Sequence, residues 1–528
     1  MAKLSGIGTI SGFLKSLETY PGHVALEVED HFMTYSQLFS IVGKLGNLII
    51  KTDSSQDNLV GILAYRSLCT YSGILSTLAA GKGYVPLNPK FPVKRLISIL
   101  KFSNSNIIIV GKEFYPVINE VLTQISYPVS VVIPDVCRNE YELAFMNRHC
   151  YFFKNDIENE TSDIQFREID LRKPASVLFT SGTTGVPKGI PISHFNLASY
   201  IKFICDKYDF NQNDRCSQAF DTTFDPSVHD MFITWNVGAA LISVPEKELI
   251  APASFIISKK ITVWYSVPSI AMFMMRMRIL KPGIFKNLRY SIFSGEALSI
   301  DLVELWMKAA PDSKVVNYYG PTEVTINITD YVWEHEKLSY NGIVSIGKVF
   351  NNHNYRIVDE NLHPVPVGEI GELIISGDQV CYGYINNPDK NKECFVNIEN
   401  RTYYKTGDLV KEHPDRNILY LGRLDHQVKI RGYRVELGEI EQSVKNFTNA
   451  NAIAIAYPVQ NNVAEGIVIF IEHSEYMDES AIRDHCSKSL PEYMIPKKYI
   501  FVNNFPLSIN GKIDRKKLIE IITEYESS

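Results

Sequence analysis

The stretch that decides the fold runs from Val177 to Gly189 and reads V-L-F-T-S-G-T-T-G-V-P-K-G. It begins with apolar residues typical of a buried strand, continues through small hydroxylated residues and glycines, and ends in Pro187-Lys188-Gly189. Glycines let the backbone curl until several N–H groups point at one spot, while hydroxyl groups and a lysine add donors and a positive charge. The stretch therefore predicts a strand followed by a loop that holds a polyphosphate.

A Walker motif and a plain surface loop are two other interpretations of this stretch, and both fit it less well than a strand followed by a polyphosphate-binding loop. The Walker pattern G-x-x-x-x-G-K-[ST] fails because Lys188 is followed by glycine and the spacing differs. A flexible surface loop is the simplest alternative, but the strand before it and the Pro-Lys-Gly after it argue against one. Ser193 can cap the next segment, where apolar residues recur at helical spacing, so we expect a strand, a loop and then a helix.

Length and composition restrict the kind of protein. A chain of 528 residues is too long for one core, so we expect two or more domains. Its 45% hydrophobic and 21% charged residues are ordinary for a soluble globular protein. The net charge of −6 and the lack of a basic block argue against nucleic acid as the main ligand. No uncharged apolar run approaches about 18 residues, so we expect no membrane span.

The cysteines and the N-terminus indicate the cellular compartment in which we expect the protein. The eight cysteines are scattered and none forms a C-x-x-C pair, which is typical of free thiols in a reducing cytosol rather than of disulfides or a zinc site. The first residues lack a long apolar core with a cleavage site, so we expect no signal peptide. These features predict a cytoplasmic protein, which we expect to be a monomer.

Short apolar runs alternate with amphipathic segments over the first part of the chain, as in parallel sheets covered by helices. We expect strands at 59–64, 84–87, 107–110, 239–244, 262–266, 289–293 and 314–318. The polar, mixed stretch 138–170 is expected to be loop. The strands before residues 180, 294 and 319 end in glycine-bearing polar loops, and ligands in open α/β sheets bind at the carboxyl ends of strands. We therefore expect these three loops to surround one crevice.

The character of the chain changes twice after these strands. Residues 342–424 are rich in Val, Ile, Gly and Tyr with short alternating runs, which predicts an antiparallel β subdomain. Residues 425–528 predict a smaller α+β unit, with helices around 437–444 and 480–490 and strands at 452–457 and 467–471. The fold class is thus α/β: an N-terminal domain, 1–424, of parallel or mixed sheets covered by helices and carrying the β subdomain, and a small C-terminal α+β domain, 425–528.

Five motifs in order carry a resemblance that covers about residues 20–518. They lie at 180–189, 317–323 (N-Y-Y-G-P-T-E), 404–408 (Y-K-T-G-D), 422–441 (from G-R-L-D to E-L-G-E-I-E) and 510–514 (N-G-K-I-D). The chain resembles the adenylate-forming (AMP-binding) superfamily. Within it, the motifs are similar to those of stand-alone amino-acid adenylation domains of nonribosomal peptide synthesis and of D-alanine:carrier-protein ligases.

The resemblance implies a nucleotide site for ATP and Mg²⁺. Thr180 and Thr184 would hold the β- and γ-phosphates with the help of Lys188, Thr322 would contact the α-phosphate, and Glu323 would be the Mg²⁺ ligand. Tyr319 would stack on adenine, and Asp408 and Arg423 would contact the ribose. The remaining nucleotide-binding positions would be Ser181, Gly182, Thr183, Gly185, Ser294, Gly295, Glu296, Asn317, Tyr318, Gly320 and Tyr420.

The resemblance also implies a two-state cycle. Lys512, in the turn Asn-Gly-Lys, would bridge the substrate carboxylate and the α-phosphate during adenylation. The C-terminal domain would be mobile and would then rotate about a hinge at Asp425, withdrawing Lys512 and presenting residues 429–436 for attack by a thiol.

A substrate pocket is implied by further matching positions. Asp225 would pair with the α-ammonium group of an amino acid, because a buried carboxylate needs a partner, although an aspartate favoured by a helix dipole is the structural alternative. The other pocket positions are Pro226, His229, Tyr265, Ile292, Ser294, Tyr318, Ile326 and Asn327. The two tyrosines and the histidine would take up space in the pocket and leave polar groups at its edges, so we expect a small or polar amino acid as the substrate.

The remaining expectations concern the acceptor of the activated amino acid and two alternative functions. No carrier domain follows Ile513, so we expect the amino acid to pass to the phosphopantetheine thiol of a separate carrier protein, or to a small thiol. An acyl-CoA ligase for a carboxylic acid is one alternative, and Asp225 and the motif Gly-Pro-Thr-Glu argue against it. A catalytically dead carrier-binding scaffold is the other, and it should have lost Lys512, Glu323 or Asp408, which are all present.

Overall fold

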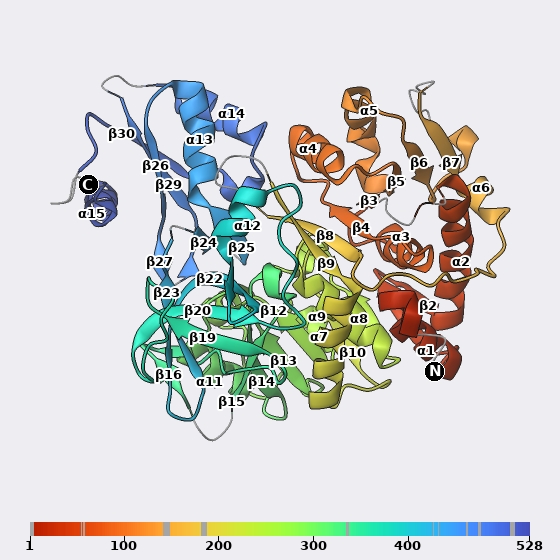
Figure 1. Cartoon of the computed structure of the whole chain (residues 1–528), viewed down its shortest axis with the longest axis horizontal. Coiled ribbons are helices and arrows are strands. Elements are labelled where there is room, and N and C mark those ends of the chain that lie inside the picture. The colour runs from red at the N-terminus through yellow and green to blue at the C-terminus, as the bar shows by residue number, and fades with distance from the viewer. Residues whose placement is uncertain are drawn as a thin grey trace. The chain divides into compact units, whose positions relative to one another are not determined.

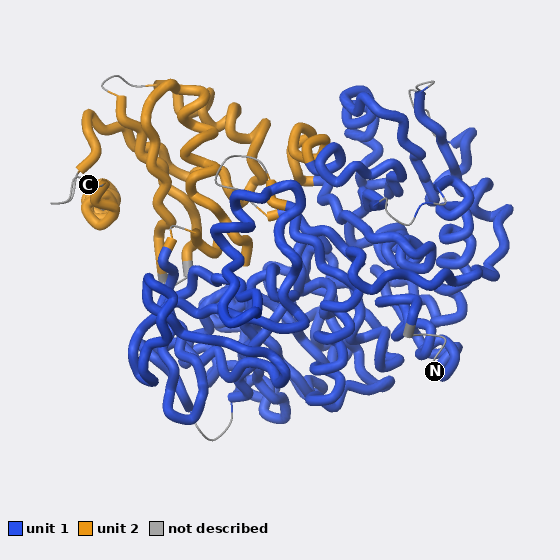
Figure 2. Tube along the Cα trace, viewed as in Figure 1, with its two compact units in different colours: residues 1–89, 99–179, 189–424 blue, residues 90–98, 180–188, 425–528 orange. Residues whose placement is uncertain are grey.

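The structure is a computed structural model of the chain, and it describes residues 5–53, 55, 59–140, 148–180, 187–333, 337–425, 427–430, 432–460, 463–473, 477–506 and 513–527. The chain divides into two compact units, shown in Figure 2. The first comprises residues 1–89, 99–179 and 189–424, and the second comprises 90–98, 180–188 and 425–528. The fold is α/β with mixed sheets, as the alternation of apolar runs predicted.

A seven-stranded sheet of the first unit holds the strand that leads into the glycine-rich stretch (Figure 1). Its order is β7-β6-β5-β3-β4-β8-β9. The strands are β3 (Val60–Leu63), β4 (Tyr84–Leu87), β5 (Ile107–Val110), β6 (Ser130–Ile133), β7 (Cys150–Phe153), β8 (Pro174–Thr180) and β9 (Lys188–Ser193). The accompanying helices are α2 (Tyr35–Thr52), α3 (Leu68–Ala79), α4 (Val93–Ser103), α5 (Tyr115–Gln124) and α6 (Lys154–Glu158). The three strands expected here are confirmed.

The expectation of loop throughout 138–170 is wrong. The segment contains β7, which pairs in parallel with β6, and the short helix α6. The aromatic run Tyr151-Phe152-Phe153 forms this strand. The sequence did not reveal it, because a strand at the edge of a sheet is only partly buried and the polar residues around it obscure its apolar pattern.

A nine-stranded sheet forms the other large layer of the first unit, in the order β18-β15-β14-β13-β12-β10-β11-β1-β2. Its strands are β1 (Val24–Val28), β2 (His31–Thr34), β10 (Arg215–Gln218), β11 (Ala240–Ser243), β12 (Val263–Ser266), β13 (Tyr290–Phe293), β14 (Lys314–Tyr319), β15 (Thr329–Trp333) and β18 (Lys348–Val349). The helices connected with it are α1 (Ser11–Thr19), α7 (His194–Lys207), α8 (Pro226–Asn236), α9 (Ala253–Ser258), α10 (Pro268–Arg276) and α11 (Ile300–Ala309). The pairs from β1 to β14 are parallel, so β10, β12, β13 and β14 share one carboxyl edge.

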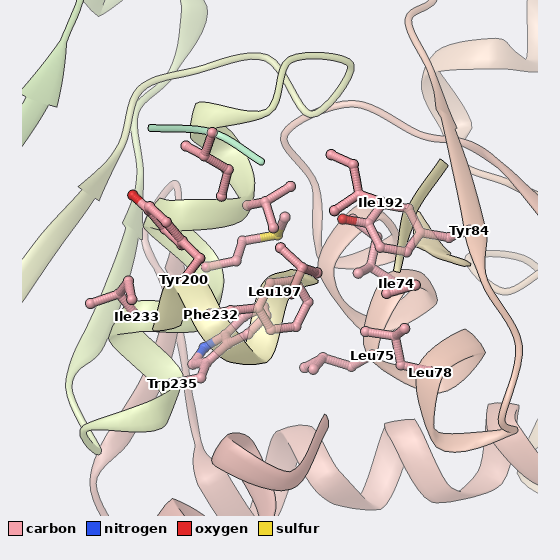
Figure 3. Packing of buried hydrophobic residues seen from close by; sticks show 14 of the residues in the cluster. Ile74, Leu75, Leu78, Tyr84, Ile192, Leu197, Tyr200, Phe232, Ile233 and Trp235 are labelled. Carbon is pink, nitrogen blue, oxygen red and sulfur yellow. The ribbon is translucent and has the colours of Figure 1, made fainter. Parts of the chain in front are cut away.

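A continuous hydrophobic core joins helices α1, α2, α3, α7 and α8 of this unit (Figure 3). Residues of α3, such as Leu75 and Leu78, and of α7 and α8, such as Leu197 and Trp235, are fully buried in it. Helix α8 also packs on β10 and β11, and the Trp235 indole donates to the carbonyl of Ala25 at 2.9 Å. Such close packing fixes α7 and α8 on the sheet, and both helices carry residues of the candidate site.

The β subdomain expected after residue 342 is present. A five-stranded antiparallel sheet contains β19 (Asn354–Val358), β20 (Ile370–Ser376), β21 (Phe395–Ile398), β22 (Arg401–Glu412) and β23 (Ile418–Arg423). Smaller elements beside it are β16 (Ser339–Tyr340), β17 (Ile343–Val344) and α12 (Pro388–Cys394).

The second unit contains the α+β segment predicted for the C-terminal part. Its two sheets are built from β24 (Gln427–Ile430), β25 (Tyr433–Glu436), β27 (Val459–Gln460) and β28 (Val463–Ala464), and from β26 (Ala452–Ala456), β29 (Ile467–Glu472) and β30 (Lys498–Val502). Its helices are α13 (Leu437–Thr448), α14 (Glu479–Ser487) and α15 (Arg515–Ser527). Among the residues that the structure describes, no helix has the length and apolar character needed to cross a membrane.

Candidate active site

Two of the three predicted loops begin at the carboxyl edge of the nine-stranded sheet. Tyr265 on β12 lies in register with Ile292 on β13, and Phe293 lies in register with Asn317 on β14. Because these strands are adjacent and parallel, the loops that follow Phe293 and Tyr319 leave the sheet side by side. Two of the three predicted loops are thereby brought together, and the third continues from Thr180, the last residue of β8.

Asp408 is held by two groups from different elements. It pairs with Arg423 across β22 and β23, with 2.8 Å between Nη1 and Oδ1, and the Tyr319 hydroxyl donates to Oδ2 at 2.5 Å. Burial and the Asp408 charge raise the pKa of Tyr319 well above its usual value, so the phenol keeps the proton that it donates. A carboxylate has further lone pairs, so Asp408 can still accept from the two hydroxyl groups of a ribose. The ring of Tyr420 lies 6.4 Å from that of Tyr319, beside this group.

Glu323 lies on a short 3₁₀ turn, Thr322–Val324, between β14 and β15. Its side chain is 1% exposed, and the Tyr384 hydroxyl donates to Oε1 at 2.7 Å. The backbone N–H of Cys381 also donates to the Glu323 carbonyl at 2.8 Å. One carboxylate fits a Mg²⁺ ion that takes its other ligands from water and nucleotide phosphates. Within the described part of the chain, no group of three or more His, Cys, Asp or Glu side chains could hold a metal.

The predicted phosphate loop is described only at its ends. Thr180 closes β8 and Lys188 opens β9. Within the second unit, Lys188 Nζ lies 3.0 Å from Glu436 Oε1, and the Gln427 amide donates to the same oxygen at 2.7 Å. The ammonium group thus has a buried carboxylate partner, and its role at the phosphates stays a prediction. The remaining predicted residues of this loop and the bridging lysine lie outside the described residues: Ser181, Gly182, Thr183, Thr184, Gly185 and Lys512.

The predicted substrate positions form one buried cluster at the carboxyl edge of the nine-stranded sheet. Asp225 immediately precedes α8, with Pro226 as the first helical residue, and its side chain makes no capping hydrogen bond. Asp225 thus lies at the N-terminal end of α8, where the helix dipole also favours a carboxylate. Burial raises the pKa of Tyr200 and of Tyr265 above the usual value, and the Asp225 charge adds to the effect on both. Asp225 is 8% exposed, so its carboxylate is almost closed to water.

Hydrogen bonds link the polar groups of this cluster. The Asn327 amide donates to the hydroxyls of Tyr200, at 3.1 Å, and Tyr265, at 3.0 Å. The Tyr265 hydroxyl also lies 2.6 Å from Ser294 Oγ, and the Tyr200 hydroxyl lies 2.6 Å from His229 Nδ1. These contacts satisfy polar groups that would be costly to bury alone and fix the direction of each side chain.

Aromatic rings pack against one another in this cluster. The His229 ring lies 4.9 Å from Tyr265 and 5.9 Å from Tyr318, and these two tyrosines lie 6.0 Å apart. Burial lowers the pKa of His229 to about 3, so the imidazole is neutral near pH 7. The other two positions, Ile292 and Ile326, are 0% and 2% exposed. A substrate side chain at this cluster would therefore contact neutral aromatic rings.

Tyr200 and Tyr384 were missed by reasoning from the sequence. Tyr200 stands at helical spacing among the apolar residues that follow Ser193, and its hydroxyl carries no local signal of a role. Tyr384 follows Gly383 in the β subdomain, far from the motifs with which its side chain makes contact.

The other predicted nucleotide residues have structural contacts of their own. Glu296 accepts from the backbone N–H of Ser269, in the first turn of α10, at 2.8 Å, and Gly295 has a positive φ of 86°. Asn317 donates to the Ser345 carbonyl at 3.0 Å. Gly320 is required sterically, because a Cβ there would lie 2.7 Å from the Cα of Asn327. These contacts position the loops, and the nucleotide roles of the four residues stay predictions.

Comparisons with known proteins agree with this arrangement. The model of the family described as AMP-binding enzyme matches residues 13–385. Tyrocidine synthase 3 of Brevibacillus parabrevis is 32% identical over 94% of this chain, and gramicidin S synthase 1 of Brevibacillus brevis is 31% identical over 96% of it. The chain spans only 7% and 44% of these two proteins.

Among solved structures, the adenylation domain AlmE of Vibrio cholerae, in complex with glycyl-adenosine-5'-phosphate, superposes with a TM-score of 0.88. It is 30% identical, and the match covers 98% of both chains. IdnL7 matches with a TM-score of 0.73 and 29% identity over 98% of this chain and 99% of that chain.

The fold and the site thus define an adenylation domain. The chain belongs to the AMP-binding enzyme family, which confirms the resemblance drawn from its five motifs.

Proposed function

We propose that this protein activates a small amino acid with ATP and then transfers it to the phosphopantetheine thiol of a carrier protein. A carboxylate oxygen of the amino acid attacks the α-phosphorus of ATP, the bond to the β-phosphate breaks, and pyrophosphate leaves. The thiolate then attacks the acyl carbon of the mixed anhydride, and AMP leaves. Members of the AMP-binding family use ATP, which supports the first step.

One observation carries the amino-acid assignment. Asp225 is a buried carboxylate at the start of α8, the helix that carries His229 of the hydrogen-bonded cluster. An α-ammonium group is the part of an amino acid that a carboxylate at this position would recognise, by opposite charge. AlmE, which resembles this chain over almost its whole length, is seen with a glycyl adenylate, and this supports glycine or a similarly small amino acid.

The residues of this chain divide the chemistry of the first step. Asp408, with Arg423 and Tyr319, would orient the ribose, and Thr322 would contact the α-phosphate. Glu323, oriented by Tyr384, would hold Mg²⁺, which when bound would neutralise charge on the phosphates. Lys512 would stabilise the charge that develops between the carboxylate and the α-phosphate. The second unit would turn about Asp425 between the two steps.

The test is amino-acid-dependent ATP–pyrophosphate exchange over a panel of L-, D- and β-amino acids and simple carboxylic acids. We expect exchange with glycine or another small amino acid. Exchange only with acids that lack an amine would refute the role of Asp225 and favour an acyl ligase. For the second step, radiolabelled amino acid should pass to a phosphopantetheinylated carrier protein, and transfer to coenzyme A alone would contradict the carrier assignment.

A further inference from the structure

The loop that connects β14 with β15 is held in an unfavourable backbone conformation. It carries Thr322, Glu323 and the pocket residues Ile326 and Asn327. Thr325 has a φ of 62° and Ile326 a φ of 72°. Positive φ is rare for β-branched residues, because the side chain crowds the backbone, and two in succession persist only when the surroundings impose them.

Gln379 imposes this conformation from the β subdomain. Its side-chain amide donates to the carbonyls of Val324 at 3.2 Å, Thr325 at 3.3 Å and Asn327 at 2.8 Å. In return, the Thr325 hydroxyl donates to the backbone carbonyl of Gln379 at 2.6 Å. Gln379 is 0% exposed, so water cannot replace its amide as the donor to these carbonyls.

Gln379 is itself tied to the helix that follows the glycine-rich stretch. The Asn196 amide donates to the carbonyls of Asp378 at 2.6 Å and Val380 at 3.2 Å, on either side of Gln379. Asn196 also closes the capping box of α7 with Ser193, the last residue of β9. A connected set of hydrogen bonds therefore runs from the start of α7 through Gln379 to the loop 322–327.

We propose that Gln379 is a positioning residue of this site, which keeps the loop 322–327 in the conformation that presents Thr322 and Glu323 to the nucleotide and Ile326 and Asn327 to the amino acid. The inference rests on the proposed function for what the loop residues bind. Gln379 touches neither substrate and acts through the carbonyls that it holds.

The experiment compares Gln379→Leu with a matched control, Gln218→Leu. Gln218 is also 0% exposed, but its amide bonds to Tyr71 and Phe220 instead. For each variant, the dissociation constant of a non-hydrolysable ATP analogue with Mg²⁺ is measured, together with kcat and KM for amino-acid-dependent exchange and the melting temperature. We expect Gln379→Leu to weaken analogue binding and to lower kcat/KM by roughly 10- to 100-fold, since buried carbonyls lose their donor. Gln218→Leu should lower the melting temperature while leaving the dissociation constant of the ATP analogue nearly unchanged.

A second variant separates positioning from simple loss of stability. Glycine adopts positive φ without strain, so Thr325→Gly in the Gln379→Leu background should recover part of the lost kcat/KM. The inference would be overturned if the losses of kcat/KM added up in the double variant. It would also be overturned if Gln379→Leu and Gln218→Leu had the same effect on analogue binding and on kcat/KM. If the wild-type protein exchanges with no acid at all, the proposed function fails, and binding of the ATP analogue still decides whether Gln379 positions the loop.

Discussion

Asp225→Asn is the substitution that tests the amino-acid site most directly. The exchange keeps the shape of the side chain and removes its charge. We expect the KM for the amino acid to rise while the KM for ATP stays the same, because only the ammonium group of the substrate loses its partner. A carboxylic acid of the same shape that lacks the amine should be activated no worse by the variant than by the wild type.

The size of the effect follows from the burial of this carboxylate. Asp225 is 8% exposed, so an effective dielectric constant of about 20 applies, and two unit charges about 4 Å apart then interact by about 4 kcal/mol. The asparagine oxygen still accepts a weaker, neutral hydrogen bond, which leaves a net loss of about 3 kcal/mol. That loss corresponds to a roughly 100- to 200-fold decrease in kcat/KM for the amino acid.

The assay is ATP–pyrophosphate exchange with the preferred amino acid and with its amine-free counterpart. Asp230→Asn serves as the control, because Asp230 lies on the same helix and is 3% exposed, while burial raises the pKa of its carboxyl group well above the usual value, so this substitution removes little charge. This control should lose stability without a selective change in the amino-acid KM. A change of less than about threefold in kcat/KM for Asp225→Asn would refute the reasoning.

Three further predictions concern the neighbours of these groups. Tyr265→Ala should destabilise the protein by about 3–5 kcal/mol and shift exchange toward amino acids with larger side chains, and an unchanged preference would show that the ring does not limit the substrate. Tyr384→Phe removes the donor to Glu323, so the Mg²⁺ concentration for half-maximal exchange should rise by about five- to tenfold while the melting temperature changes little. Burial lowers the pKa of His229 from 6.5 to about 3, so the unfolded chain binds the proton more tightly and the free energy of unfolding falls as the pH drops below 6.5. From pH 7 to 5 this residue should account for a loss of about 2 kcal/mol, which urea titration should find missing in His229→Gln.

The order of the motifs was enough to predict the family and most of the first unit. Parallel strands buried on both faces, such as β3 and β5, are continuous apolar runs that stand out in the local sequence. The glycine-bearing loops after β13 and β14 could be assigned to one crevice, because parallel strands share a carboxyl edge. An edge strand such as β7 lacked this signal and was missed.

The local chemistry of the candidate site was therefore determined by the sequence alone. Residue types and their spacing alone indicate the chemistry of three features. These are the carboxylate of Asp225, the carboxylate of Glu323 and the glycine-rich stretch after β8. Such signals are local, because strand, turn and helix preferences act over a few neighbouring residues.

Only the tertiary structure decided which side chains support these groups. Tyr384 reaches Glu323 from 61 residues away, and Gln379 reaches Asn327 from 52 residues away. A tyrosine or a glutamine carries no local pattern that announces such a contact. The partners are selected by the packing of the β subdomain against the loop between β14 and β15, where each buried polar group must find a hydrogen-bonding partner.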